Sequence, residues 1–123
     1  MTSQVLLIED EPNIIEAITF ILSRDGWQVR SHAGGPDAMD VVRARRPDLI
    51  VLDVMLPGRS GFDLLAEIRR DPALAQTPVL MLTARGQRKD REMAERAGAS
   101  MFMTKPFSNA EMLEAVRALA GAR

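Results

Sequence analysis

The sequence predicts an α/β fold in which a five-stranded parallel sheet is covered by helices on both faces, a doubly wound (βα)5 arrangement. Two observations predict it. Short aliphatic runs, such as residues 5–8 (VLLI), have the continuous apolar character of strands that are buried on both faces. Segments with apolar residues at helical spacing alternate with these runs, and such alternation is typical of parallel strands joined by helical crossovers.

The strands are expected where apolar runs end at polar residues. Residues 49–52 (LIVL) end at Asp53, and residues 79–82 (VLML) end at Thr83. Residues 28–31 (QVRS) have mixed polarity, which indicates a strand at the edge of the sheet. The expected strands cover residues 5–8, 28–31, 49–52, 79–82 and 101–103.

Start and stop signals delimit the helices. Pro12 and Pro36 can each occupy the first turn of a helix, and Gly98 is typical of a helix end. Ser108 and Glu111 have the spacing of a capping box, in which the serine caps the helix start and the glutamate reaches back. The expected helices cover residues 12–24, 36–46, 62–70, 87–97 and 109–120.

Length and composition are those of an ordinary globular chain, and we expect residues 1–123 to form one domain. The chain is 46% hydrophobic and 27% charged, which is not a disordered composition. Its net charge of −1 provides no strong field for nucleic acid or an anionic membrane. It has no cysteine, and the sequence indicates neither a signal peptide nor an apolar run of about 20 residues. We therefore expect a cytoplasmic protein without direct nucleic-acid or membrane contact.

Polar side chains are expected at the carboxyl ends of the predicted strands. Ligands of open parallel sheets bind outside these ends, so the residues there are the candidates for a functional site. The residues expected at this edge are Glu9, Asp10, Asp53, Thr83 and Lys105. Two carboxylates ~4 Å apart repel by roughly 4 kcal/mol at the effective dielectric of a protein surface. A hard divalent cation that prefers oxygen ligands, such as Mg²⁺, would neutralise them. We interpret Glu11, in contrast, as a solvated acid favoured by the helix dipole.

Four motifs at these strand ends make the chain resemble the receiver domain of two-component response regulators, of the chemotaxis-regulator (CheY-like) type. The motifs are IEDEP (8–12), LDVMLPGRSG (52–61), MLTAR (81–85) and TKPF (104–107). The resemblance implies a flavodoxin-like strand order of 2-1-3-4-5. It also implies a phosphoacceptor signalling switch, which receives a phosphoryl group from a histidine kinase or a phosphotransfer protein. A downstream protein or a fused effector domain would respond to it.

The same resemblance implies a role for each residue at the strand ends. Asp53 would be the phosphorylated aspartate. Mg²⁺ would be bound by Asp10, Asp53 and the backbone carbonyl of Met55, with Glu9 acting through water. The remaining implied features are the switch hydroxyl of Thr83, the phosphate-pairing amine of Lys105, the switch aromatic Phe102 and a cis bond before Pro106. Phosphorylation would then change the face formed by the fourth helix, the fifth strand and the fifth helix, where an output partner binds.

The same face is a candidate dimer surface. In the winged-helix transcription regulators of this family, receivers dimerise through charge pairs on it. Arg91 and Glu111 match one such pair, whereas Ala115 and Met101 stand where that branch has an arginine and often an acid. The residues of this dimer contact are therefore matched only in part.

Two alternatives come from other functional classes. A haloacid-dehalogenase-like phosphatase also uses an aspartate at a strand end, but it needs a second aspartate two residues later, where Met55 stands. A flavodoxin-like cofactor binder has a hydroxyl- and glycine-rich loop after the first strand. Here that loop reads EDEP, which would repel a flavin phosphate. We expect a regulatory domain rather than an enzyme, with at most weak self-phosphorylation and self-dephosphorylation.

Overall fold

The parallel sheet has the predicted topology. The computed structural model describes residues 3–84 and 88–121, and five parallel strands form one sheet in the order β2-β1-β3-β6-β7. These strands are β1 (Gln4–Ile8), β2 (Gln28–His32), β3 (Leu49–Asp53), β6 (Val79–Thr83) and β7 (Met101–Thr104). Taken in chain order within the sheet, this is the order 2-1-3-4-5, so the predicted doubly wound fold is confirmed.

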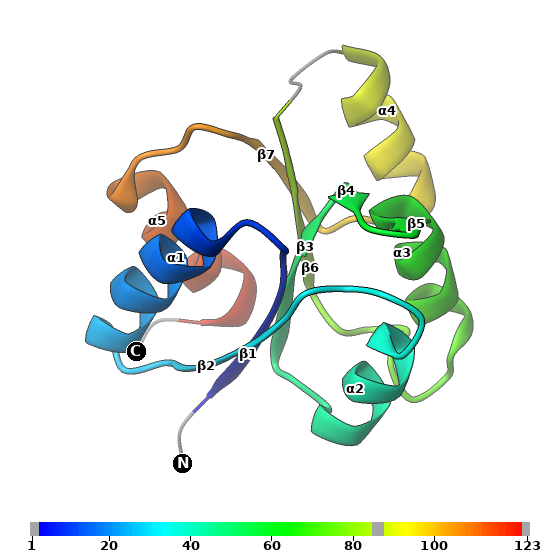
Figure 1. Ribbon diagram of the computed structural model, residues 1–123, viewed down its shortest axis with the longest axis horizontal. Helices are drawn as coiled ribbons and strands as arrows, with labels where there is room; N and C mark the ends of the chain where they lie inside the picture. Colours follow the sequence, from blue (N-terminus) through cyan, green and yellow to red (C-terminus); the bar gives the residue numbers. More distant parts are fainter. Residues whose placement is uncertain (1–2, 85–87, 122–123) are drawn as a thin grey trace.

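Helices cover both faces of the sheet, as Figure 1 shows. They are α1 (Pro12–Arg24), α2 (Ala38–Arg45), α3 (Gly61–Arg70), α4 (Arg88–Ala97) and α5 (Asn109–Ala120). Side chains alternate along each strand, so Val5 and Leu7 pack with α1 and α5, while Leu6 and Ile8 pack with the other three helices. None of the helices in the described residues is both long and apolar enough to span a membrane.

The second helix is shorter than predicted at both ends. The N–H of Ala38 donates to the carbonyl of Gly35 in a turn, and α2 starts only at Ala38. Pro36 therefore lies in the turn rather than in the helix. At the other end, Arg46 adopts a left-handed conformation with φ of 45°, which ends the helix at Arg45.

A small hairpin that the sequence analysis did not predict follows β3. Strand β4 (Met55–Leu56) pairs antiparallel with β5 (Arg59–Ser60), around a turn in which Gly58 has φ of 76°. Two-residue strands are too short to show an alternating pattern, and only the turn was expected. The predicted first residue of the fourth helix, residue 87, lies outside the described residues.

Gly61 permits a close approach between α3 and the end of β3. Its N–H donates to the carbonyl of Val54 over 2.8 Å. A β-carbon built at this position would lie 2.2 Å from the carbonyl oxygen of Asp53 and 3.0 Å from the α-carbon of Val54. The backbone that carries Asp53 is therefore positioned by the absence of a side chain at residue 61.

We predict that Gly61→Ala destabilises the protein, because the new methyl group can be accommodated only by moving backbone. Overpacking of this kind costs about 1–3 kcal/mol. The free energy of unfolding in urea measures the effect. Arg70→Ala, at an exposed position of the same helix, is the control and should change stability by no more than about 0.5 kcal/mol. Equal stability of the two variants would contradict the prediction.

Candidate functional site

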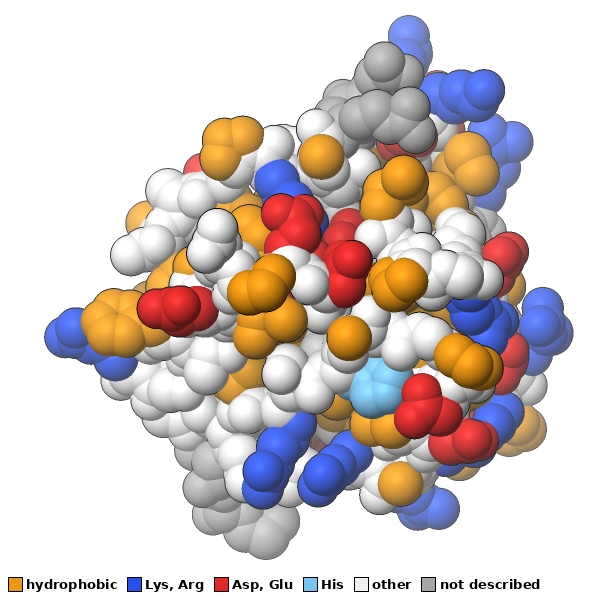
Figure 2. Space-filling model, viewed as in Figure 1, with side chains coloured by type: hydrophobic (Ala, Val, Ile, Leu, Met, Phe, Trp, Pro, Cys, Tyr) orange, Lys and Arg blue, Asp and Glu red, His pale blue; other side chains and the backbone are white. Residues whose placement is uncertain are grey.

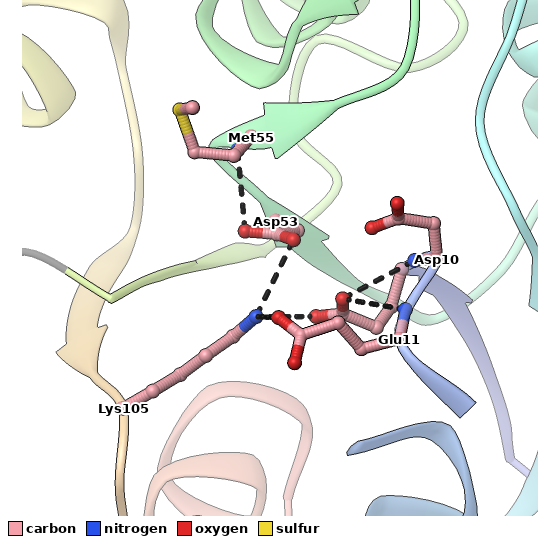
Figure 3. A network of polar contacts seen from close by, with 6 residues as sticks. Asp10, Glu11, Asp53, Met55 and Lys105 are labelled. Atoms are coloured by element: carbon pink, nitrogen blue, oxygen red, sulfur yellow. Dashed lines mark hydrogen bonds and ion pairs between the residues drawn. The ribbon is translucent and has the colours of Figure 1, made fainter. Parts of the chain in front are cut away.

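Asp53 lies at the carboxyl end of β3 and is only 2% exposed. One carboxylate oxygen, Oδ1, accepts a hydrogen bond from the N–H of Met55 over 3.2 Å. The other, Oδ2, lies 3.3 Å from Nζ of Lys105. Figure 3 shows that the side chain of Met55 points away from this carboxylate, so only its backbone faces the site.

Glu9 is completely buried next to Asp53, and the backbone partly fixes it. Its Oε1 accepts hydrogen bonds from the N–H groups of Asp10 and Glu11, over 3.2 and 3.1 Å. Its Oε2 lies 2.9 Å from Nζ of Lys105, a close ion pair rather than a well-aligned hydrogen bond. Burial raises the pKa of the Glu9 carboxyl above its ordinary value, and the bonds from Lys105 and the Glu11 N–H offset this rise only in part.

Lys105 reaches three carboxylates with one ammonium group. Besides Glu9 and Asp53, its Nζ lies 3.1 Å from Oε1 of Glu11 (Figure 3). Burial of the ammonium acts to lower the pKa of Lys105, but pairing with Glu9, Glu11 and Asp53 outweighs burial and raises it above its ordinary value. Lys105 is therefore a permanent positive charge in the site.

The contact with Glu11 extends the sequence analysis, which interpreted this residue as a solvated acid outside the site: its side chain is exposed, as expected, but it also pairs with Lys105. Glu11 occupies the N-cap position of α1, but its side chain makes no cap hydrogen bond. Instead the carboxylate reaches Lys105, which is 94 residues away in the sequence. No local pattern could indicate this partner, because the two residues meet only when β7 lies beside β6 in the folded sheet.

Asp10 is exposed at the same edge, and its position fits a shared cation. Carboxylate oxygens of Glu9, Asp10 and Asp53 lie within 4.8 Å of one another. Clustered carboxylate oxygens are the ligands that Mg²⁺ prefers. Glu9 is already held by two backbone N–H groups and by Lys105. The donor set therefore fits Mg²⁺.

The remaining predicted residues lie on β6 and β7. Thr83 ends β6, is 2% exposed, and accepts a hydrogen bond at its carbonyl from the N–H of Lys105 over 2.7 Å. Phe102 pairs in register with Met81 and is half-buried against the core. The peptide bond between Lys105 and Pro106 is cis.

The site opens to one face of the molecule. In Figure 2, acidic side chains gather near the centre of this face, close to where Figure 1 shows the end of β1. A cavity of about 620 Å³ lies beside them, and its lining includes Asp10, Met55, Lys89 and Met93. A molecule of modest size can therefore approach Asp10 from solvent.

Comparison with protein families gives a match over most of the chain. Residues 5–117 match the model of the response regulator receiver domain. Over 116 residues, the chain is 41% identical to a Mycobacterium tuberculosis protein named as the probable transcriptional regulatory protein TcrX. The match covers 94% of this chain but 48% of that protein, so the chain spans about half the length of this relative.

Solved structures with the same fold match nearly the whole chain. The chain is similar to the chemotaxis protein CheY4 of Vibrio cholerae, with a TM-score of 0.90 and 26% identity over 97% of this chain and 99% of that one. It is also similar to the receiver domain of a sensor histidine kinase from Pseudomonas aeruginosa, with a TM-score of 0.89 and 30% identity over 99% and 100% of the two chains. That second structure has a magnesium ion coordinated in its active-site cleft.

We predict that Lys105→Met destabilises the protein, since it leaves the buried carboxylates of Glu9 and Asp53 without their counter-charge. A loss of about 1–3 kcal/mol at neutral pH is expected for a buried polar group that loses its partner. The folded variant should hold the proton of Glu9 more tightly than its unfolded chain does. The loss should therefore grow as pH rises through the folded pKa of Glu9 and shrink at lower pH.

Urea unfolding between pH 4 and pH 8 measures this change, with Lys89→Met as the control because Lys89 is the other lysine and is exposed on α4. Equal losses for the two variants, or a loss that does not vary with pH, would contradict the prediction.

Proposed function

The chain belongs to the response regulator receiver domain family, and from this premise we propose that it is the phosphoacceptor switch of a two-component phosphorelay, with Asp53 as the phosphorylated residue. The observation that carries the proposal is the position of Asp53. Its carboxylate lies at a strand end, between the ammonium of Lys105 and the exposed carboxylate of Asp10. This carboxylate would be the nucleophile beside a cation, and the cavity lined by Asp10 would receive a phosphodonor.

The proposed transfer is a nucleophilic displacement at phosphorus. A carboxylate oxygen of Asp53 forms a P–O bond, the P–N bond of a donor phosphohistidine breaks, and its electron pair stays on the imidazole nitrogen. The product is a mixed anhydride on Asp53. Such a reaction depends on positioning and on neutralisation of charge more than on covalent help. Lys105 supplies a fixed positive charge 3.3 Å from Asp53.

Magnesium is the proposed cofactor. Asp10, Asp53 and the backbone carbonyl of Met55 would bind it, and Glu9 would act through water. When bound, Mg²⁺ would neutralise the carboxylates and offer open positions to phosphoryl oxygens. Asp10 is the residue best placed for this task, because it is exposed and has no ion pair within the described part of the chain.

The switch would begin with the added charge on Asp53. A phosphoryl group adds negative charge and acceptor oxygens, which Lys105 and the hydroxyl of Thr83 can approach. The carbonyl of Thr83 already bonds the N–H of Lys105, so movement of one strand end is passed to the other. Phe102 would then change its rotamer, and the face formed by α4, β7 and α5 would change shape for an output partner.

Several finer assignments belong to the same proposal. Residues 1–123 would form one receiver domain, of the chemotaxis-regulator type in its switch chemistry, which acts in the cytoplasm and is not an enzyme. A sensor histidine kinase or a phosphotransfer protein would donate the phosphoryl group. The output would be a separate protein or a fused effector domain, and dimerisation through the α4-β7-α5 face is a further option. No observation favours the phosphatase or the flavin-binding alternative.

We predict that a small phosphodonor such as acetyl phosphate, with Mg²⁺, attaches one phosphoryl group to the wild-type protein. Asp53→Asn should reduce this modification to background, because an amide oxygen is a poor nucleophile and forms no stable acyl phosphate. Intact-protein mass spectrometry measures it, and Asp63→Asn on the exposed part of α3 is the control. Undiminished labelling of Asp53→Asn would contradict the assignment, whereas continuous hydrolysis of phosphate esters would favour the phosphatase.

We predict that Mg²⁺ stabilises the wild-type protein against urea, by about 1.4 kcal/mol when the ion is at ten times its Kd. Asp10→Asn should lose most of this gain, because it removes a carboxylate ligand. Asp40→Asn, an exposed acid on α2, should keep it. Equal stabilisation of all three proteins would indicate that the ion binds elsewhere.

A further inference from the structure

Arg91 and Phe102 form a contact that the proposed switch does not yet use. Arg91 lies on α4, and the central carbon of its guanidinium is 5.1 Å from the centre of the Phe102 ring on β7. The Phe102 side chain also packs against the core cluster that includes Met81. The ring thus contacts both the apolar core and a cation, and the negative face of an aromatic ring attracts such a cation.

We propose that Arg91 is a positioning residue of the switch, which holds the Phe102 ring in the arrangement of the unphosphorylated protein. The inference rests on the proposed function, since it concerns the movement of Phe102 after Asp53 is phosphorylated. Arg91 touches neither the phosphoryl group nor the carboxylates. It acts through the ring, by making the present rotamer more stable than the alternative.

The surroundings of Arg91 single it out among the arginines of α4. Arg88 and Arg96 both approach Glu92, at 3.4 and 4.0 Å. Within the described part of the chain, Arg91 has no ion pair, and its recorded partner is the Phe102 ring. Among the described residues, no carboxylate therefore competes with the ring for this guanidinium.

The anchoring of α4 makes this contact matter. Of the ten residues in this helix, only Ala94 is buried. Because α4 buries little apolar surface, a single side-chain contact contributes substantially to the interaction that fixes the position of α4 relative to β7. If the contact exists in only one of two arrangements, its loss shifts their ratio by its own free energy. For an exposed cation–π pair this corresponds to a factor of about two to five.

The test compares Arg91→Gln with Arg88→Gln, in the full chain. Both variants remove one positive charge from the first half of α4, but only the first removes the contact with the ring. Two readouts are used: the initial rate of phosphorylation by acetyl phosphate with Mg²⁺, and the ring signals of ¹³C-labelled phenylalanine in NMR spectra. The chain has four phenylalanines, and Phe102→Leu identifies the signal of interest.

We expect Arg91→Gln to be phosphorylated about two to five times faster than Arg88→Gln. Its unphosphorylated Phe102 signal should also move toward the position found in phosphorylated wild-type protein. Arg91→Lys keeps a cation near the ring, so its phosphorylation rate and its Phe102 signal should both lie closer to those of the wild-type protein. In the Phe102→Leu background, the Arg91→Gln substitution should have no effect on the rate, because the ring through which it acts is gone.

Equal rates and equal Phe102 signals for Arg91→Gln and Arg88→Gln would overturn the inference, as would an undiminished effect of Arg91→Gln in the Phe102→Leu background. These outcomes are distinct from failure of the proposed function, which would appear as a wild-type protein that takes up no phosphoryl group on Asp53.

Discussion

The ammonium group of Lys105 is the counter-charge on which the geometry of the site depends. Glu9 is completely buried and Asp53 almost so, and burying two carboxylates side by side is costly unless a cation compensates them. Lys105 provides that cation at 2.9 and 3.3 Å. One ammonium cannot balance four neighbouring carboxylates, however, because Asp10 and Glu11 also lie at this edge. The excess negative charge explains why the edge suits a divalent cation while the chain as a whole is almost neutral.

The backbone around the site is fixed by contacts that leave little freedom. The N–H of Val54 donates to the carbonyl of Leu82, and the N–H of Lys105 donates to the carbonyl of Thr83. These bonds tie the ends of β3, β6 and β7 together. Gly61 then brings α3 against the carbonyl of Asp53, so closely that a β-carbon at residue 61 would clash with the carbonyl oxygen. The carboxylate of Asp53 is therefore held by the sheet and a helix rather than by a loop, which suits the proposed phosphoryl transfer, since that transfer would need a fixed geometry.

The sequence was sufficient to predict the sheet and which polar side chains gather at its carboxyl edge, because buried parallel strands are continuous apolar runs and their carboxyl ends must meet at one edge. Asp53 and Thr83 follow such runs directly, so their positions needed no tertiary information. The role of Glu11 could not be predicted, since its partner Lys105 is separated from it by 94 residues and its local position at a helix start has an ordinary explanation. The hairpin of β4 and β5 could not be predicted, because two-residue strands have no periodicity. Pro36 was predicted to start a helix because local sequence signals do not distinguish its turn from a first helical turn.

Among the described residues, the carboxyl end of α4 is anchored more firmly than the rest of the helix. At the carboxyl end, Arg69 donates hydrogen bonds to the carbonyl of Gly98 over 2.9 Å and to that of Thr77 over 2.7 Å. The β-carbon that Gly98 lacks would press on the Arg69 side chain at 3.2 Å. Along the rest of the helix only Ala94 is buried, whereas α3 buries four residues. Segments with few buried contacts are those that move at low cost. In the proposed switch, a displacement at the end of β6 would therefore meet the least resistance in the amino-terminal half of α4, where Arg91 contacts Phe102.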